Sequence, residues 1–135
     1  MATLPNKSVP DQRGFVACTI STAASGLSDV CDVTGYCVDA IEMSTAGAWT
    51  AANLAFLVSA RSSDSLRELW DGSTGAPVVV NMTTTGGRFV AAPKSFEGAR
   101  FVQLASINTA STAAVAQGAS RALYLILGVP SGPIK

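Results

Sequence analysis

The stretch Ala48–Arg61, Ala-Trp-Thr-Ala-Ala-Asn-Leu-Ala-Phe-Leu-Val-Ser-Ala-Arg, is the clearest hydrophobic unit of the chain. Leu54, Phe56 and Val58 occupy alternate positions within it. Because side chains two residues apart point to the same side of a strand, they form one continuous apolar face. The residues between them are small or weakly apolar, which favours a strand that is covered on both sides. Trp49 precedes the strand, where its large ring can close one end of the core.

Short alternating apolar segments recur on both sides of this stretch, separated by turn residues roughly every 8–12 positions. Asp71–Gly75 is the strongest turn signal, and Pro93 is expected to end the strand that precedes it. The alanines of Asn108–Ser120 favour a helix, but Gly118 and the Ser/Thr content favour a loop that touches the sandwich. Further strands are expected at Phe15–Ile20, Asp29–Val33, Tyr36–Met43, Leu66–Trp70, Pro77–Met82, Arg88–Ala92, Arg100–Ile107 and Arg121–Val129.

This spacing predicts an all-β fold, an antiparallel β-sandwich or jelly roll of about eight strands. The chain shows no strand–helix–strand alternation, which argues against a parallel α/β sheet. At 135 residues we expect one domain. Residues 1–14 are proline-bearing and poor in apolar side chains, so they are expected to form an extended N-terminal arm, with residues 15–135 as a single β-sandwich domain.

Charged residues make up only 13% of the chain, against about 25% in a typical globular domain. So thinly charged a surface is expected either to be partly buried against neighbouring subunits or to belong to a protein that works at low free concentration. The alternative is a monomer from a species with alanine-rich proteins. Nine basic and nine acidic residues without like-charge runs argue against nucleic-acid binding. With no membrane-spanning stretch and no signal peptide, folding in a reducing cytoplasm is expected.

The chemistry-bearing residues favour neither an enzyme nor a cofactor or metal site. The chain has no histidine, so the usual Ser-His-Asp and Cys-His arrangements are excluded. The acidic group from Asp29 to Glu42 matches no ordered calcium loop and is expected to face solvent. Cys18, Cys31 and Cys37 are expected to be small buried thiols, with a disulfide or a zinc site as the alternatives.

Four aromatic residues, Trp49, Trp70, Tyr36 and Tyr124, are candidates for stacking on sugar rings. Packing in the core or at its rim is the commoner role of such residues in a small sandwich. Trp49 and Trp70 are the candidates that we retain for saccharide binding.

Several phrases of the chain resemble those of small virion proteins of tailed bacteriophages and prophages. They are Ala48–Ala60, the acidic aromatic turn Leu69-Trp70-Asp71-Gly72, Phe96–Val102 and Ala114–Arg121. The resemblance spans most of Phe15–Val129. The chain departs from the pattern in its proline-bearing arm and its three cysteines.

The resemblance implies a β-sandwich subunit of the virion, assembled in the host bacterial cytoplasm. The expected role is a capsid decoration or cement protein that binds the major capsid protein on the outer shell and copies of itself. Threefold clustering, and hence a trimer, is expected. The arm is expected to dock on the shell through Leu4, Pro5, Val9 and Pro10.

Two other interpretations remain open at this point. The first is a tail or head-fibre accessory protein that presents the sandwich to host saccharides. The second is a cytoplasmic bacterial binding module that is unrelated to virions.

Overall fold

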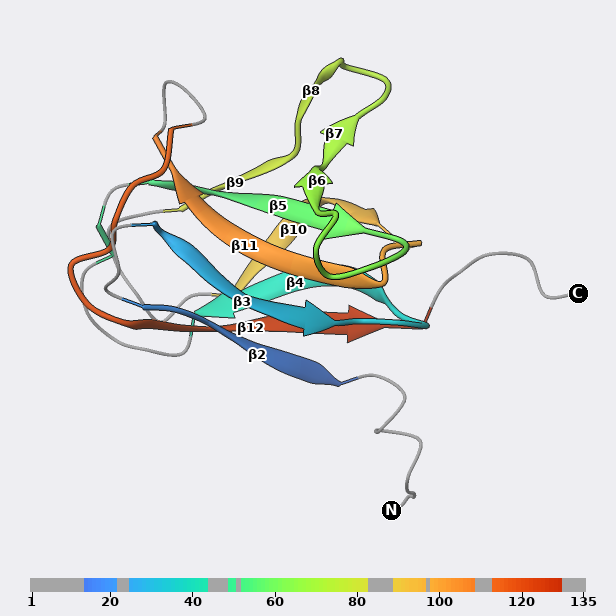
Figure 1. Cartoon of the computed structure of the whole chain (residues 1–135), viewed down its shortest axis with the longest axis horizontal. Coiled ribbons are helices and arrows are strands. Elements are labelled where there is room, and N and C mark those ends of the chain that lie inside the picture. Colours follow the sequence, from blue (N-terminus) through green and yellow to red (C-terminus); the bar gives the residue numbers. More distant parts are fainter. Residues whose placement is uncertain are drawn as a thin grey trace, which may run out of the picture.

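A computed structural model describes residues 14–21, 25–43, 49–50, 52–82, 89–96, 98–108 and 113–129. The described residues contain strands, turns and loops but no helix (Figure 1). The arm residues Leu4, Pro5, Val9 and Pro10 lie outside them. The strands are β2 (Phe15–Ile20), β3 (Leu27–Asp32), β4 (Cys37–Met43), β5 (Asn53–Ser59), β6 (Arg67–Glu68), β7 (Trp70–Asp71), β8 (Ala76–Pro77), β9 (Val79–Asn81), β10 (Phe89–Phe96), β11 (Phe101–Ile107) and β12 (Arg121–Gly128).

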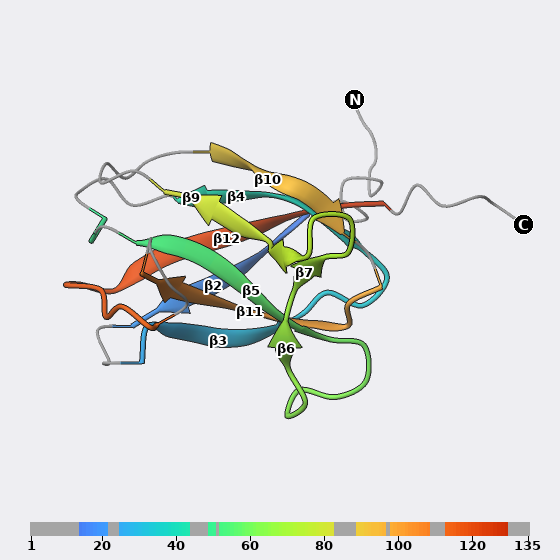
Figure 2. The same ribbon diagram turned by 90° about the horizontal axis from the view of Figure 1, so that it is seen from above.

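The strands form a jelly roll, as the strand spacing predicts. One layer, which we call the β2 layer, has the order β2-β12-β4-β10. The other, the β5 layer, has the order β3-β11-β5, with β6 and β9 both pairing β5. The two layers join where β2 meets β3, at Ile20 and Ser28, so a single antiparallel sheet curls over on itself. Figures 1 and 2 show β5 and β11 lying across β2, β12 and β4.

The core lies between the layers and is built from the stretch that opens at Ala48. Leu54 and Phe56 are fully buried, and each such side chain contributes about 1.5–3 kcal/mol. The Phe56 ring meets the Phe96 ring edge to face, with 5.1 Å between centroids. Trp49 is only 1% exposed, and its indole N–H donates to the carbonyl of Ala52 at 3.0 Å. The ring therefore belongs to the core, as its place at the start of the stretch predicts.

The outer face of β5 is also apolar. Ala55 lies opposite Ala105 of β11, and both are buried together with Ile107 in a second small cluster. Leu27, Leu57 and Val79 pack around this cluster. The expectation of an uncharged second face on the β5 stretch is therefore confirmed.

Two strands differ from the sequence prediction. Pro93 does not end its strand, because β10 continues from Phe89 to Phe96. Among the described strands it pairs with β4 alone, so it lies at an edge, where a residue without a backbone N–H is tolerated. The predicted strand Leu66–Trp70 is interrupted at Leu69, and β6 and β7 lie on either side of it. The Leu69 N–H still donates to the Phe56 carbonyl of β5, whereas the Leu69 carbonyl accepts from the Val78 N–H, so pairing with β5 ends at this residue.

The segment after β11 is a loop wherever it is described, and one buried side chain fixes it to the sandwich. Gln117 is 3% exposed. Its Oε1 accepts from the Thr50 N–H at 3.0 Å, and its Nε2 donates to the Thr50 carbonyl at 3.1 Å. Arg121 Nε donates to the same Oε1 at 3.1 Å, and the Thr50 hydroxyl accepts from the N–H of Gly118. We call this set the Gln117 clasp.

Candidate functional site

Two adjoining hollows lie at the end of the jelly roll where β5 and β10 end. Their volumes are about 380 and 300 Å³, and they share Ala60, Gly98 and Ala99. We call them together the arginine groove. The first hollow is also lined by Val58, Ser59, Arg61, Ser65, Arg67, Leu69 and Phe96, and the second by Thr34, Gly35, Tyr36 and Arg100.

The groove combines an apolar floor with a cationic rim. Val58, Leu69 and Phe96 are partly buried and pack against the core. Arg61, Arg67 and Arg100 are exposed, and the described residues that line the two hollows include no acidic side chain. The groove therefore suits a group that carries a carboxylate next to an apolar side chain, since guanidinium groups bind carboxylates through charge-assisted hydrogen bonds.

Backbone hydrogen bonds bring the three turns of the groove together. The Ser59 hydroxyl accepts from the N–H groups of Arg61 and Ser62, at 3.1 and 3.2 Å, and so shapes the turn after β5. The Arg100 N–H donates to the Ser59 carbonyl, and the Arg100 carbonyl accepts from the N–H of Val33. Gly98 has a φ of 91°, which a residue with a side chain rarely adopts. The backbone of the turns that carry the rim is thus fixed by hydrogen bonds at the ends of the strands.

The arginines at the rim have different interaction partners. The Arg100 guanidinium lies over the ring of Phe101, 5.1 Å from its centroid. Hydrogen bonds from the Thr34 hydroxyl and N–H, at 2.6 and 2.9 Å, lower the pKa of Asp32, and Arg100 lowers it further. Asp32 therefore stays ionised beside Arg100. Arg67 donates to the Leu66 carbonyl, which carries no formal charge.

A short hairpin formed by β7 and β8 stands away from the two layers (Figure 1). Trp70 on this hairpin is 53% exposed, and its indole N–H donates to Glu68 at 3.0 Å. The Asp71 carboxylate accepts from the N–H and hydroxyl of Ser73, and the Asp71 carbonyl accepts from Gly75. Residues Glu68–Pro77 include two acidic and no basic side chains. The hairpin is therefore an acidic projection with an exposed aromatic ring.

The aromatic residues proposed for sugar stacking do not gather at one site. Trp49 is in the core, so its ring offers no face to a sugar, whereas Trp70 lies on the hairpin. Tyr36 packs against the core and lines the second hollow. Tyr124 contacts Phe15 edge to face, with 5.2 Å between centroids. The arginine groove itself was not predicted, because its arginines come from the turn after β5, from β6 and from the residue before β11, and they share no sequence periodicity.

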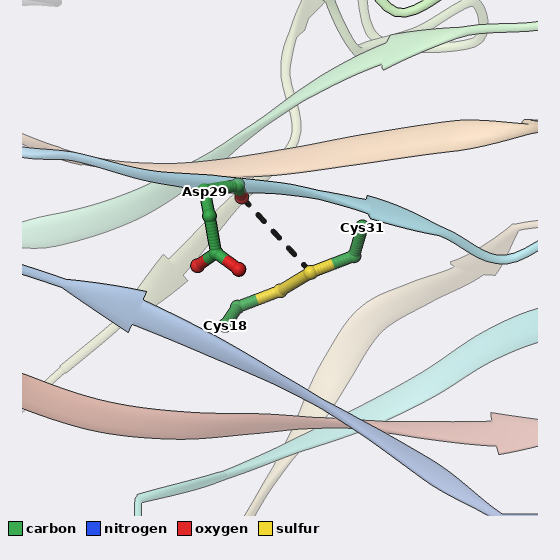
Figure 3. A group of neighbouring side chains, drawn as sticks. All are labelled: Cys18, Asp29 and Cys31. Carbon is green, nitrogen blue, oxygen red and sulfur yellow. Dashed lines mark hydrogen bonds between the residues drawn. A yellow bond between two sulfur atoms is a disulfide. The ribbon is translucent and has the colours of Figure 1, made fainter.

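The cysteine expectation is wrong for two of the three residues. Cys18 of β2 and Cys31 of β3 form a disulfide at the corner where the layers join (Figure 3). We call it the corner disulfide. Asp29 lies beside it, and its carboxylate accepts from the N–H of Thr19 at 2.8 Å. The zinc alternative requires both sulfurs as thiolates, which the disulfide excludes. Cys37 is buried outside the disulfide, and its thiol donates to Asp39 at 3.4 Å.

No family model, curated protein or solved structure gives a significant match to this chain. The resemblance to phage virion proteins therefore stays a prediction. Among the described residues, no helix has both the length and the apolar character needed to span a membrane.

Proposed function

We propose that this chain is a structural subunit of a bacteriophage virion, a capsid decoration protein that binds the outer shell and copies of itself. The observation that carries the proposal is the uncharged outer surface formed by β5 and β11, the two central strands of the β5 layer. In an antiparallel sandwich that is free in solution, the outward positions of the strands are usually polar. Here they are occupied mainly by alanine and larger apolar residues.

The cross-strand pairs of the β5 layer show how continuous this surface is. Val30 of β3 lies opposite Gln103 of β11, which lies opposite Leu57 of β5. The next row contains Ala105 and Ala55. Val30 is 37% exposed. The part of the face formed by β5 and β11 costs little to cover, because it carries no charge. Glu68, opposite Leu57, and Asp32, opposite Phe101, border it on its two sides.

The β2 layer adds an apolar row on its outer face, next to a row that contains the exposed Glu42 of β4. Phe15 is 67% exposed although it lies within a strand, and it pairs with Ile126 of β12. Ile126 lies opposite Ala40 of β4, so apolar residues continue across three strands. Both outer faces of the jelly roll can therefore meet other subunits. This supports a role in which one copy has neighbours on more than one side.

Many weak contacts are sufficient for such a role. Subunits that bind the shell and one another turn modest single affinities into firm attachment, because the second contact forms at high effective concentration. The major capsid protein is the proposed shell partner, and the expected arm, residues 1–14, is the proposed second contact. Gly14, where that arm joins the sandwich, accepts a hydrogen bond from Leu127 at the end of β12.

The experiment is decoration of purified empty shells, measured by co-sedimentation and by locating the subunit in particle density. Leu57→Lys places a charge on the β5 outer face and should lower occupancy. Ala119→Lys adds the same charge on an exposed loop and should leave occupancy unchanged. Wild-type protein that fails to sediment with shells, together with genomic neighbours that include no terminase, portal or capsid gene, would refute the proposal in favour of an unrelated cytoplasmic module.

One observation favours a second candidate, a tail or head-fibre protein that binds host saccharides. Trp70 presents an exposed ring on a projecting hairpin, which suits stacking on a sugar. Binding on a glycan array that is lost in Trp70→Ala would support this candidate. An array without signal would leave decoration as the function to pursue.

A further inference from the structure

The β7–β8 hairpin and the arginine groove have opposite shapes and opposite charges. The hairpin projects, carries Glu68 and Asp71 and exposes Trp70. The groove is hollow, has an apolar floor and carries arginines on its rim. We infer that the hairpin of one copy inserts into the arginine groove of the next copy. This inference deepens the proposed function, because it assigns the self-association that function requires.

The chemistry of the two parts matches group by group. The Trp70 ring would lie on the floor formed by Val58, Leu69 and Phe96, all of them partly buried apolar side chains. Tryptophan and arginine are among the residues most enriched at interface hot spots, which lie in well-packed, desolvated pockets. The carboxylates of the hairpin would meet Arg61 and Arg67. These ion pairs would become stronger as water leaves the groove, because charge-assisted hydrogen bonds are stronger where the dielectric constant is low.

The hairpin cannot occupy the groove of its own chain. Leu69 lines the groove, whereas Trp70 is 53% exposed and is not among the described residues that line it. The root of the hairpin is also fixed, because the Leu69 N–H donates to Phe56 and the Val78 N–H donates to Leu69, both at 2.9 Å. The projection is thus held outward, beside a hollow that it does not fill. A second copy is the occupant that supplies the matching part.

This contact joins two different surfaces, so it is heterologous. Repeated contacts of this kind form a closed ring when the rotation between copies closes, and an open chain otherwise. The trimer expected for a decoration protein requires closure after three copies. The prediction that follows is specific: a copy with a defective hairpin still accepts a neighbour, and a copy with a defective groove still offers its hairpin.

The test uses the full chain without any shell, by sedimentation velocity over roughly 10 μM to 1 mM, the range of weak interfaces. Wild type should form a closed oligomer. Trp70→Ala, and separately the double variant Arg61→Glu/Arg67→Glu, should weaken association by about 30-fold or more, the effect of removing one hot spot. Ala119→Lys serves as the control and should associate like wild type. The exposed positions keep the fold intact, which far-UV circular dichroism verifies.

A mixture of Trp70→Ala with the double variant Arg61→Glu/Arg67→Glu tests whether the hairpin of one copy enters the groove of another. The intact hairpin of the double variant should enter the intact groove of Trp70→Ala, so that the mixture forms dimers and nothing larger. A mixture that stays monomeric overturns the inference, as does a wild type that stays monomeric throughout the range. Association lost only in Leu57→Lys would also overturn it and assign self-association to the β5 outer face. Shell decoration is measured separately, so a monomer that decorates shells refutes the ring and leaves the shell-binding part of the proposed function standing.

Discussion

Replacing Gln117 by leucine should destabilise the domain by about 3 kcal/mol. The side chain is 3% exposed and makes three hydrogen bonds, two with the backbone of Thr50 and one with Arg121. Each such bond contributes about 1 kcal/mol net, and a donor or acceptor that is left buried without a partner costs about 1–3 kcal/mol. Leucine has a similar volume, so the loss reports the hydrogen bonds rather than a cavity. Against a total stability of about 5–15 kcal/mol, this is a large fraction.

The assay is equilibrium unfolding in urea, followed by the fluorescence of the buried Trp49. Thr50→Val is the matched comparison, because it removes the hydroxyl that accepts from Gly118 and keeps the backbone groups that Gln117 pairs with. Its loss should be about 1 kcal/mol. A Gln117→Leu protein within about 0.5 kcal/mol of wild type, the usual scatter of a surface substitution, would refute the reasoning.

Three further predictions follow from single features of the structure. Gly26→Ala should lower the unfolding free energy by more than Gly75→Ala does. Both glycines have a φ of 66°, so the backbone strain of an added side chain is the same at both. Of the two, only Gly26 lacks room, because the added carbon would lie 2.5 Å from the Val115 carbonyl oxygen. Equal losses of unfolding free energy in urea for the two variants would contradict this prediction. Thr34→Val should raise the pKa of Asp32 in a carboxyl NMR titration. Because the lowered pKa stabilises the fold above the ordinary pKa of aspartate, that stability is lost as the pH falls through the lowered value, and an unchanged pKa would exclude the hydrogen bond. Reducing the corner disulfide should lower the unfolding free energy by about 3 kcal/mol, the value expected for a sequence separation of 13. The reductant should leave the stability of a variant with serine at both cysteine positions unchanged.

The fold was predictable because its signals are local. Alternation along the chain marks the buried faces, so Leu54 and Phe56 could be assigned to the core from the sequence. The turn at Asp71–Gly75 was equally clear, since Asp-Gly and a second glycine tolerate positive φ, and Gly75 does adopt it. Each of these features depends on residues within a few positions of one another.

The features that the sequence did not predict depend on residues that become neighbours only in the folded chain. Whether Pro93 ends a strand depends on whether that strand lies at an edge, which only the strand order reveals. Cys18 and Cys31 meet because β2 and β3 are adjacent at the corner, and no sequence spacing indicates that. Gln117 looks like a solvent-exposed loop residue until Thr50, 67 positions away, is placed beside it.

The two ends of the jelly roll divide the tasks that an assembling subunit has to perform. At one end the polar groups of the Gln117 clasp satisfy the backbone of Thr50 within the chain. At the other end, three of the six arginines of the chain lie on the rim of the arginine groove, whose described lining residues include no acidic side chain. Apolar outer faces provide contact area but do not determine how two subunits are oriented. Charge pairs do determine the orientation, and they also exclude wrong partners. A subunit with so few charges therefore gains defined geometry by concentrating them where one neighbour meets the next.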